Sequence, residues 1–248
     1  RGIIGHADQF DAALFGITPT LAKLMDPQQR VFLEVCRDVL EYSGYLVSKK
    51  PPRIGIFAGT GNNTYFQNNL QYHPEEIAKI GAFQVMLANE KDYIATRTAY
   101  QLDLKGPAVS LNTACSTSLV AIAQAVEAIR NGQCDMAIAG GVSITVPIKS
   151  GHRYEEGAMF SADGHTRPFD AEATGTVFSD GAGVVLLKNL DDAEAAGDTI
   201  YAVIRGIGLS NDGGGKGSFM APSAVGQASA IRMALDDANF SPETNGYI

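Results

Sequence analysis

The chain has 248 residues, of which 45% are hydrophobic and 19% charged, and its formal net charge is −8. This length suits one large α/β domain with a sizeable buried core. The acidic balance argues against a nucleic-acid groove, since phosphate binding needs clustered Lys and Arg. No apolar run approaches the ~18 residues that span a bilayer, and no secretory signal is visible. We therefore expect a cytoplasmic protein without nucleic-acid or membrane partners.

The first 24 residues are rich in turns and hold no obvious strand. A helix is predicted next, because Asp26 is a credible N-cap, Pro27 suits the first helical position and apolar residues recur until Gly44. Apolar runs and their flanking turns then predict a buried strand at 54–58, mixed helix and loop at 64–100, and a second strand at 108–111.

Residues 116–130 are apolar on almost every side, which is typical of a helix buried inside a domain. Asn131–Gly132 has the pattern of its C-terminal cap. Further strands are predicted at 136–144 and 184–188. The order strand, helix, strand predicts parallel βαβ units with right-handed crossovers.

A polar stretch, NLDDAEAAGD, separates this part of the chain from a second one. In the second part the patterns predict a strand at 200–209, a flexible loop at 213–217 and a helix at 225–238. The chain stops in what has the pattern of another strand. We therefore predict two parts, residues 1–190 and 191–248, and expect the sequence to be incomplete at both ends.

The chain has three cysteines, Cys36, Cys115 and Cys134, too few and too far apart for a disulfide framework. No C-x-x-C pair is present, which argues against a structural zinc site, and we expect no metal. Without a secretory signal, reduced thiols are the default. Each cysteine is then either buried filler or a reactive group.

Cys115 stands at the junction of a predicted strand and a predicted helix. The N–H groups and the macrodipole at a helix N-terminus, worth about +0.5 charge, stabilise a thiolate. Backbone N–H groups of the same turn can donate to a developing oxyanion, and small neighbours leave room for a thioester. Local context leaves two interpretations open, a reactive thiol and a small buried hydrophobe.

The segment around Cys115, NTACSTSLVAIAQAVEAIRNGQCDMAIAGGVSI, resembles the active-site segment of β-ketoacyl synthases, whose cysteine receives the acyl chain. MDPQQR at 25–30 is similar to a signature of modular type I ketosynthases. Later blocks follow in family order: GIFAGT at 55–60, MFSADGHTRPFDAEATGTVFSDGAGVVLLK at 159–188 and SNDGGGKGSFMAPSAVGQ at 210–227. Over essentially its whole length, the chain resembles the ketosynthase domain of a modular type I polyketide synthase.

This resemblance implies an α/β, thiolase-like fold, a five-layered α-β-α-β-α sandwich that is truncated here. Residues 1–190 would be the N-terminal half without its first strand, and residues 191–248 the start of the C-terminal half. Cys115 would be the acyl-thioester nucleophile, and its N–H an oxyanion donor. The family's two histidines lie in C-terminal motifs that these 248 residues lack, so the fragment alone is expected to be inactive.

The resemblance also implies the reaction and the partners. Cys115 would accept an acyl group from the phosphopantetheine arm of an acyl carrier protein, with no cofactor bound directly. Decarboxylative Claisen condensation with a malonyl-type extender, also on a carrier protein, would follow. Family members are homodimers, paired partly through the strand at about 108–112 here, and they work beside neighbouring polyketide synthase domains.

The other candidate residues receive structural interpretations. Cys36 and Cys134 are expected to be structural, and so, or solvent-facing, are the four histidines: His6, His73, His152 and His165. Asp180 stands where the family often has Glu. Three basic residues could receive an acidic carrier protein or form a solvated loop: Lys49, Lys50 and Arg53.

Two alternatives from other classes remain. One is a related thiolase-fold enzyme such as a fatty-acid condensing enzyme, although MDPQQR favours the polyketide type. The other is a non-condensing scaffold protein, a class that typically loses the nucleophile, whereas Cys115 is retained. The sequence does not favour a cysteine protease, since no papain-type context surrounds any cysteine.

Overall fold

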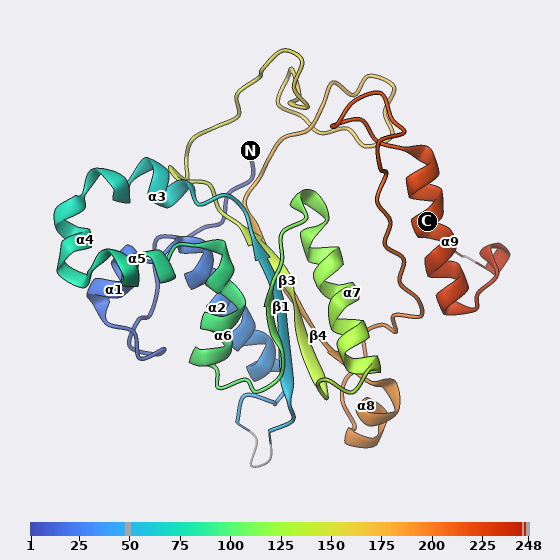
Figure 1. Cartoon of the computed structure of the whole chain (residues 1–248), viewed down its shortest axis with the longest axis horizontal. Helices are drawn as coiled ribbons and strands as arrows, with labels where there is room; N and C mark the ends of the chain where they lie inside the picture. The colour runs from blue at the N-terminus through green and yellow to red at the C-terminus, as the bar shows by residue number, and fades with distance from the viewer. Residues whose placement is uncertain (48–50, 245, 247–248) are drawn as a thin grey trace. The chain divides into compact units, whose positions relative to one another are not determined.

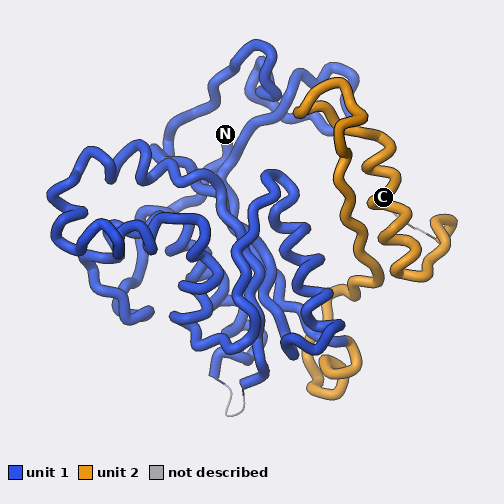
Figure 2. The backbone as a smooth tube through the Cα atoms, in the orientation of Figure 1, with its two compact units in different colours: residues 1–189 blue, residues 190–248 orange. Residues whose placement is uncertain are grey.

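The computed structural model describes residues 1–47, 51–244 and 246. They divide into two compact units, unit 1 with residues Arg1–Asn189 and unit 2 with residues Leu190–Ile248 (Figure 2). The assignment of residues 1–190 and 191–248 to the two halves of a family domain stays a prediction. Among the described helices, none combines the length and the hydrophobicity that a membrane span requires.

Unit 1 is built on a four-stranded sheet of order β2-β1-β3-β4 (Figure 1). The strands are β1 (Ile54–Thr60), β2 (Ala108–Ser110), β3 (Met136–Ser143) and β4 (Gly181–Lys188). β1 runs parallel to both neighbours, and its Ile56 lies opposite Ala108 and Ile138. β4 runs antiparallel to β3. The predicted parallel pairing is therefore confirmed for the first three strands and wrong for β4.

The direction of β4 follows from the segment that precedes it. Residues 144–180 contain no helix, so this segment leaves the carboxyl end of β3 and returns to the same end of the sheet. A strand that returns without a crossover helix has to run antiparallel.

Within the segment 144–180, hydrogen bonds to one carboxylate hold a turn at residues 161–167. Asp163 Oδ1 accepts the hydroxyl of Ser161 at 2.9 Å and the backbone N–H of His165 at 3.1 Å, and Arg167 donates to the same carboxylate. The Ser161 hydroxyl and the His165 N–H lower the pKa of Asp163 to about 2. The carboxylate thus stays ionised at neutral pH and holds the turn together.

Helices cover both faces of the sheet (Figure 1). α2 (Pro27–Tyr42) and α6 (Ile94–Gln101) pack on one face, and α7 (Thr117–Arg130) packs on the other. Unit 1 therefore has three layers, helix, sheet and helix. Shorter elements complete it: α1 (Pro19–Leu24), α3 (Thr64–Asn68), η1 (Leu70–Tyr72), α4 (Pro74–Ile80), α5 (Ala82–Leu87), η2 (Lys91–Tyr93) and η3 (Ala114–Ser116).

The two faces of the sheet differ in side-chain size. Toward α2 and α6, large apolar residues form the main core, including Phe32, Ile56 and Ile138. Toward α7 the packing residues are mostly small, and they come from both surfaces: Ala121, Ala125 and Ala128 on the helix, Ala137 and Ala139 on β3. Because successive strand residues point to opposite faces, the alternation of large and small residues along β3 produces this difference: Met136 and Ile138 face α2 and α6, and Ala137 and Ala139 face α7. α7 can therefore approach the sheet closely.

The prediction that residues 116–130 are buried on every side is wrong for the described structure. The buried residues of α7 are its alanines, whereas Leu119 is 68% exposed. The physical reason is that unit 1 covers α7 only on its sheet-facing side. Its outer apolar side chains have no covering layer within that unit.

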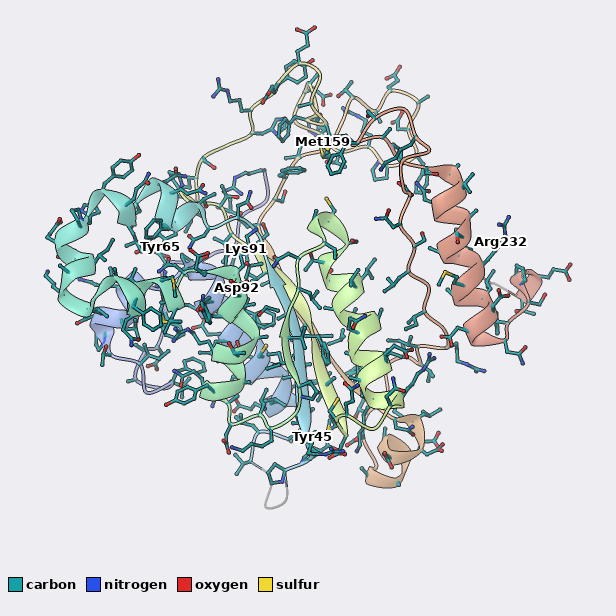
Figure 3. All side chains as sticks on the ribbon, in the orientation of Figure 1. Tyr45, Tyr65, Lys91, Asp92, Met159 and Arg232 are labelled. Carbon is teal, nitrogen blue, oxygen red and sulfur yellow. The ribbon has the colours of Figure 1, made fainter. Side chains whose placement is uncertain are left out.

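The first turn of α2 agrees with its prediction. Asp26 is the N-cap and its Oδ1 accepts the N–H of Gln28 at 2.9 Å, while Pro27 is the first helical residue. The helix ends at Tyr42, and Gly44 follows with φ +80°. At the amino edge of β3, Tyr45 (labelled in Figure 3) accepts a hydrogen bond of 2.7 Å from Lys188 Nζ.

Unit 2 contains α8 (Leu190–Ala196), α9 (Ala224–Ala238) and the short η4 (Pro242–Thr244). The helix predicted at 225–238 is confirmed as α9. The strand predicted at 200–209 is wrong, because its backbone has no partner strand among the described residues. This segment lies along α9 instead: a Cβ at Gly206 would come 2.1 Å from Ala234 O, and one at Gly208 would come 2.0 Å from Ala230 O.

A buried ion pair joins the first residue of the chain to the start of β4. Arg1 Nη1 lies 2.6 Å from Asp180 Oδ1, and the two side chains are 6% and 0% exposed. Arg1 also donates to Ile148 O at 2.8 Å, and the same Asp180 oxygen accepts the N–H of Thr145 at 2.9 Å. The pair therefore joins three segments that are distant in sequence.

Asp180→Ala is expected to lower the free energy of unfolding by about 3–5 kcal/mol, because it leaves the Arg1 guanidinium buried without its counter-charge. Chemical denaturation measures this loss. Glu41→Ala is the matched control, since it breaks the solvent-exposed Arg37–Glu41 pair and is expected to cost about 0.5 kcal/mol. Equal losses in the two variants would contradict the role given to Asp180.

Candidate active site

Cys115 lies in η3, the single turn between β2 and α7, at the carboxyl edge of the sheet. It is exposed, whereas Cys36 and Cys134 are buried in the apolar layers on the two faces of the sheet. Burial raises the pKa of both of these thiols, which keeps them neutral. Cys115 is thus the one thiol in the described residues that a solvent-borne electrophile can reach.

Hydrogen bonds within the turn fix the backbone around Cys115. Thr113 N donates to Thr117 Oγ1 at 2.9 Å, and that hydroxyl donates to Ala114 O at 2.7 Å. Ser116 Oγ donates to Thr113 O at 2.9 Å. The Ser116 and Thr117 hydroxyls therefore tie the turn to itself. The backbone N–H of Cys115 lies in the first turn of η3, where the helix itself supplies no acceptor.

The residue before Cys115 adopts a left-handed backbone. Ala114 has φ +54°, a conformation that costs an L-residue about 1–2 kcal/mol. The chain accepts this strain because it must turn sharply from β2 into α7. Strained turns of this kind occur where a side chain has to be presented at a fixed position.

Gly59, near the end of β1, allows α7 to approach. A Cβ at this position would lie 2.2 Å from Thr117 Cγ2 and 2.3 Å from Leu111 O. The backbone at Leu111 continues the sheet, since its N–H donates to Ala58 O at 2.9 Å. Any side chain at residue 59 would therefore push away the turn that carries Cys115.

The histidines lie apart from Cys115, and none of their rings is hydrogen-bonded to it in the described structure. His6 is exposed, His73 lies 3.4 Å from Glu75, and His152 Nε2 lies 2.7 Å from Ser161 O. His165 takes part in the turn around Asp163 through its backbone. Within residues 1–47, 51–244 and 246, no three His, Cys, Asp or Glu side chains gather as a metal site would require.

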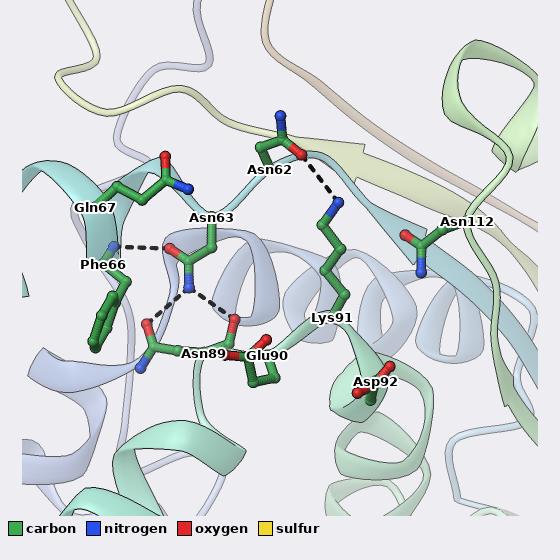
Figure 4. Close-up of a pocket in the computed structure, with 9 residues that line it drawn as sticks. All are labelled: Asn62, Asn63, Phe66, Gln67, Asn89, Glu90, Lys91, Asp92 and Asn112. Carbon is green, nitrogen blue, oxygen red and sulfur yellow. Dashed lines mark hydrogen bonds between the residues drawn. The ribbon is translucent and has the colours of Figure 1, made fainter.

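A polar pocket of about 310 Å³ lies at the same edge of the sheet (Figure 4). Its walls come from the loop after β1, from α3, from the segment before α6 and from the turn after β2. The lining residues are Asn62, Asn63, Phe66, Gln67, Asn89, Glu90, Lys91, Asp92 and Asn112. Asn112 belongs to the turn that carries Cys115, so the pocket and the thiol share one segment of the chain.

Two asparagines form the fixed wall of this pocket. Asn63 Nδ2 donates to the backbone oxygen of Asn89 at 2.7 Å, and Asn63 Oδ1 accepts the N–H of Phe66 at 2.8 Å (Figure 4). Asn89 is 4% exposed and donates to Leu24 O at 2.6 Å. Both side chains are therefore committed to holding the loops in place.

The MDPQQR segment, residues 25–30, supports the same edge of the sheet through a buried side chain. Gln28 is fully buried, and its Nε2 donates to Asp26 Oδ2 at 2.9 Å and to Asn62 O at 3.3 Å. Its Oε1 accepts the N–H of Ile144 at 3.3 Å. One side chain thus joins the start of α2 to the carboxyl ends of β1 and β3.

Sequence patterns did not reveal the pocket residues or the bridging role of Gln28. The only local signal was the run GTGNN directly after a buried strand, because polar residues at the carboxyl end of a parallel strand often line a site. Of the basic residues considered as a carrier surface, Arg53 pairs with Asp135 at 3.1 Å at the opposite, amino edge of the sheet. Lys49 and Lys50 lie outside the described residues.

The ionisation of Asp26 makes the stability of the folded state depend on pH. Burial raises the pKa of Asp26 to about 6, although hydrogen bonds from the backbone and side chain of Gln28 lower it. The folded state therefore binds a proton more tightly than the unfolded chain, where an Asp has a pKa of about 3.9. Stability from this group is fully present below pH ~4 and is lost as the pH rises to ~6.

Asp26→Asn is expected to remove this loss of unfolding free energy between pH 4 and 6, which amounts to on the order of 2–3 kcal/mol. Asn keeps the N-cap acceptor but does not titrate. The measurement is the free energy of unfolding from pH 4 to 7. An unchanged slope in the variant would mean that another group causes the pH dependence.

Gly59→Ala is expected to displace the Cys115 turn and to change the rate at which Cys115 is alkylated by a small thiol reagent by about tenfold or more. The reason is the backbone oxygen of Leu111, which cannot move aside as a flexible side chain could. Gly181→Ala is the control, because its Cβ would meet nothing within 4 Å. Identical alkylation rates in wild type and Gly59→Ala would refute the steric argument.

The chain is similar to known proteins. Residues 1–193 match the family model of the β-ketoacyl synthase N-terminal domain, and residues 201–248 match that of its C-terminal domain. A phenolphthiocerol/phthiocerol polyketide synthase of Mycobacterium tuberculosis is 40% identical over 252 residues, covering 99% of this chain. The chain spans only 17% of the length of that relative.

Two solved structures are also similar. Ketosynthase twelve of the bacillaene polyketide synthase from Bacillus amyloliquefaciens has a TM-score of 0.90 at 36% identity, covering 98% of this chain and 42% of that one. The ketosynthase from module 1 of the bacillaene synthase of Bacillus amyloliquefaciens FZB42 has a TM-score of 0.84 at 35% identity, covering 98% and 41%. The predicted α/β, thiolase-like fold class is confirmed. This chain belongs to the β-ketoacyl synthase family, with the ketosynthases of modular type I polyketide synthases.

Proposed function

We propose that Cys115 is the acyl-accepting nucleophile of a polyketide-forming ketosynthase. The observation that carries this proposal is its position, an exposed thiol at the N-terminus of α7 in a turn fixed by its neighbours. The thiolate attacks the carbonyl carbon of an acyl thioester on the phosphopantetheine arm of an acyl carrier protein. A new S–C bond forms, and the carrier thiolate leaves. The free N–H of Cys115 supports the oxyanion of the tetrahedral intermediate.

The second stage is decarboxylative Claisen condensation. A malonyl-type extender on a carrier protein loses carbon dioxide, and its enolate carbon attacks the Cys115 thioester. A C–C bond forms, and the Cys115 thiolate is released. Enolate formation needs hydrogen-bond donors on the extender's carbonyl, which the family supplies with two histidines. Residues 1–248 lack those motifs, so we propose that this stretch alone accepts the acyl group without condensing it.

The partners follow from the same proposal. Carrier proteins deliver both substrates, and neighbouring polyketide synthase domains act on the product. We also propose that the protein is a homodimer paired partly through β2, which is the edge strand of the described sheet and leaves its outer backbone groups open. The boundary between two halves near residue 190 belongs to this proposal, and a cytoplasmic location stays a prediction.

The alternatives are less well supported. The relatives are ketosynthases of polyketide synthases, which does not favour a fatty-acid condensing enzyme. A scaffold protein would not need the exposed thiol that this chain retains.

The full-length natural protein is expected to gain one acyl group at Cys115 when it is incubated with an acyl thioester, and Cys115→Ala is expected to gain none. Intact-protein mass spectrometry measures the adduct. Cys36→Ala is the matched control and should acylate like wild type, because its thiol is fully buried.

Equal labelling of wild type and Cys115→Ala would assign the reaction to another group. No labelling of a folded wild type by several acyl donors would favour the scaffold alternative.

A further inference from the structure

The peptide group that joins Ala114 to Cys115 is held at its oxygen. Ala114 O accepts the backbone N–H of Thr117 and, at 2.7 Å, the hydroxyl of the same residue. Both donors belong to Thr117, the first residue of α7. The position of Thr117 therefore sets the direction of the Ala114 carbonyl.

The same contacts set the direction of the Cys115 N–H. A trans peptide group is planar, and its N–H points opposite to its C=O. Among the described residues the one cis peptide bond is Val146–Pro147, so the bond between Ala114 and Cys115 is trans. With Ala114 O directed at Thr117, the Cys115 N–H has to point away from Thr117. Its own helix supplies it with no acceptor, which leaves this donor to a ligand.

The side chain of Thr117 is itself fixed at two points. Its Oγ1 accepts the backbone N–H of Thr113 at 2.9 Å, so the hydroxyl proton is left for Ala114 O. Its methyl group lies so close to β1 that a Cβ at Gly59 would come 2.2 Å from Thr117 Cγ2. Because a β-branched side chain has few χ1 rotamers, a fixed methyl group also fixes the hydroxyl. Thr117 thereby transmits the position of the sheet to the peptide group.

The backbone at Ala114 depends on this support. Its φ of +54° is a left-handed conformation that an L-residue avoids, and the hydrogen bonds of the Thr117 hydroxyl are of the same order as that strain. Without the hydroxyl, rotation about the Ala114 backbone relieves the strain and turns the Cys115 N–H. Ser116 does not replace Thr117, because its hydroxyl donates to Thr113 O and Thr113 Oγ1.

Resting on the proposed function, we propose that Thr117 is a positioning residue that aims the Cys115 N–H at the carbonyl oxygen of the acyl thioester. When the Cys115 thiolate attacks, an S–C bond forms and the carbonyl electron pair moves to the oxygen. An N–H aimed at this oxygen stabilises its charge, and collapse of the intermediate restores the carbonyl and expels the carrier thiolate. Thr117 acts on this step through the peptide group before Cys115.

The test compares two reactions of the Cys115 thiolate in the full-length protein. Acyl transfer from an acyl-pantetheine thioester passes through an oxyanion, whereas alkylation by iodoacetamide displaces iodide without forming one. Peptide mass spectrometry follows the modification of Cys115 in both, with acyl transfer measured against donor concentration. A residue that only supports the fold or the thiolate changes both rates alike, and a residue that aims the N–H changes only the first.

Thr117→Val is expected to slow acyl transfer to Cys115 by about ten- to hundredfold at saturating donor, because removal of a whole oxyanion donor costs about 10²–10³ and a misdirected one costs less. Alkylation is expected to stay close to the wild-type rate. Thr117→Ser keeps the hydroxyl and is expected to restore acyl transfer. Thr117→Ala removes the hydroxyl without adding a methyl group beside Ala114 and is expected to show the same split, so the test does not depend on the folding of the Val variant.

Ser43→Ala is the matched control. Ser43 Oγ donates to the backbone oxygen of Leu40, three residues earlier, at 3.2 Å. This is the same kind of contact as that between Thr117 and Ala114. Ser43 follows α2 near Tyr45, at the amino edge of the sheet, so its loss should leave both rates unchanged.

The outcomes separate the two proposals. Equal slowing of both reactions in Thr117→Val and Thr117→Ala, or acyl transfer at the wild-type rate in both, would overturn the role given to Thr117 and leave Cys115 as the nucleophile. No acyl transfer to Cys115 in a wild type that is still alkylated there would overturn the proposed function and the role of Thr117 together.

Discussion

The close contact between α7 and the sheet is the constraint on which the site depends. It exists because both surfaces carry small residues: alanines on the helix, Ala137 and Ala139 on β3, and Gly59 near the end of β1. The turn that carries Cys115 enters α7 directly, so the distance between helix and sheet sets the position of the sulfur. On the opposite face, Phe32 and Ile138 fill a thicker apolar layer that anchors the sheet. The Cys115 sulfur is thus positioned by an absence of side-chain volume, which no polar contact could replace.

A second constraint acts on the loops at the carboxyl edge, where apolar packing is scarce. There the buried Gln28 bridges Asp26, Asn62 and Ile144, and Asn89 joins α1 to the segment before α6. Buried polar groups are costly unless they are paired, so a network of this kind has one low-energy arrangement and few alternatives. Burying Asp26 in this network costs free energy at neutral pH, and its raised pKa shows this, because burial disfavours the charged carboxylate more than its hydrogen bonds favour it.

Features encoded locally could be predicted from the sequence. The N-cap at Asp26, the apolar runs of β1, β2 and β3 and the periodicity of α9 are short-range signals, and all appear in the structure. Features that depend on distant partners could not. The segment 200–209 has a strand pattern, but a pattern does not supply a pairing strand. The pair of Arg1 and Asp180 joins residues 179 positions apart.

For the site, the predicted strand-to-helix junction placed Cys115 correctly. Its assignment as nucleophile, however, rested on family resemblance. The pocket residues come from separate loops, so no periodic signal in the sequence could reveal them.

These constraints separate the positions that the fold requires from the positions at which the side chain can vary. A relative with 36% identity superposes with a TM-score of 0.90, so most positions tolerate other side chains while the backbone path is kept. Gly59 is not such a position, because any Cβ there collides with the backbone of the Cys115 turn. Asn112 is such a position, because its side chain is exposed and holds no other part of the described structure. A change at Asn112 therefore alters the polar wall of the pocket without removing a side-chain contact that holds the described structure. In this arrangement backbone geometry sets the position of the Cys115 sulfur, whereas side chains set the chemistry of the pocket wall, so the second can vary while the first stays fixed.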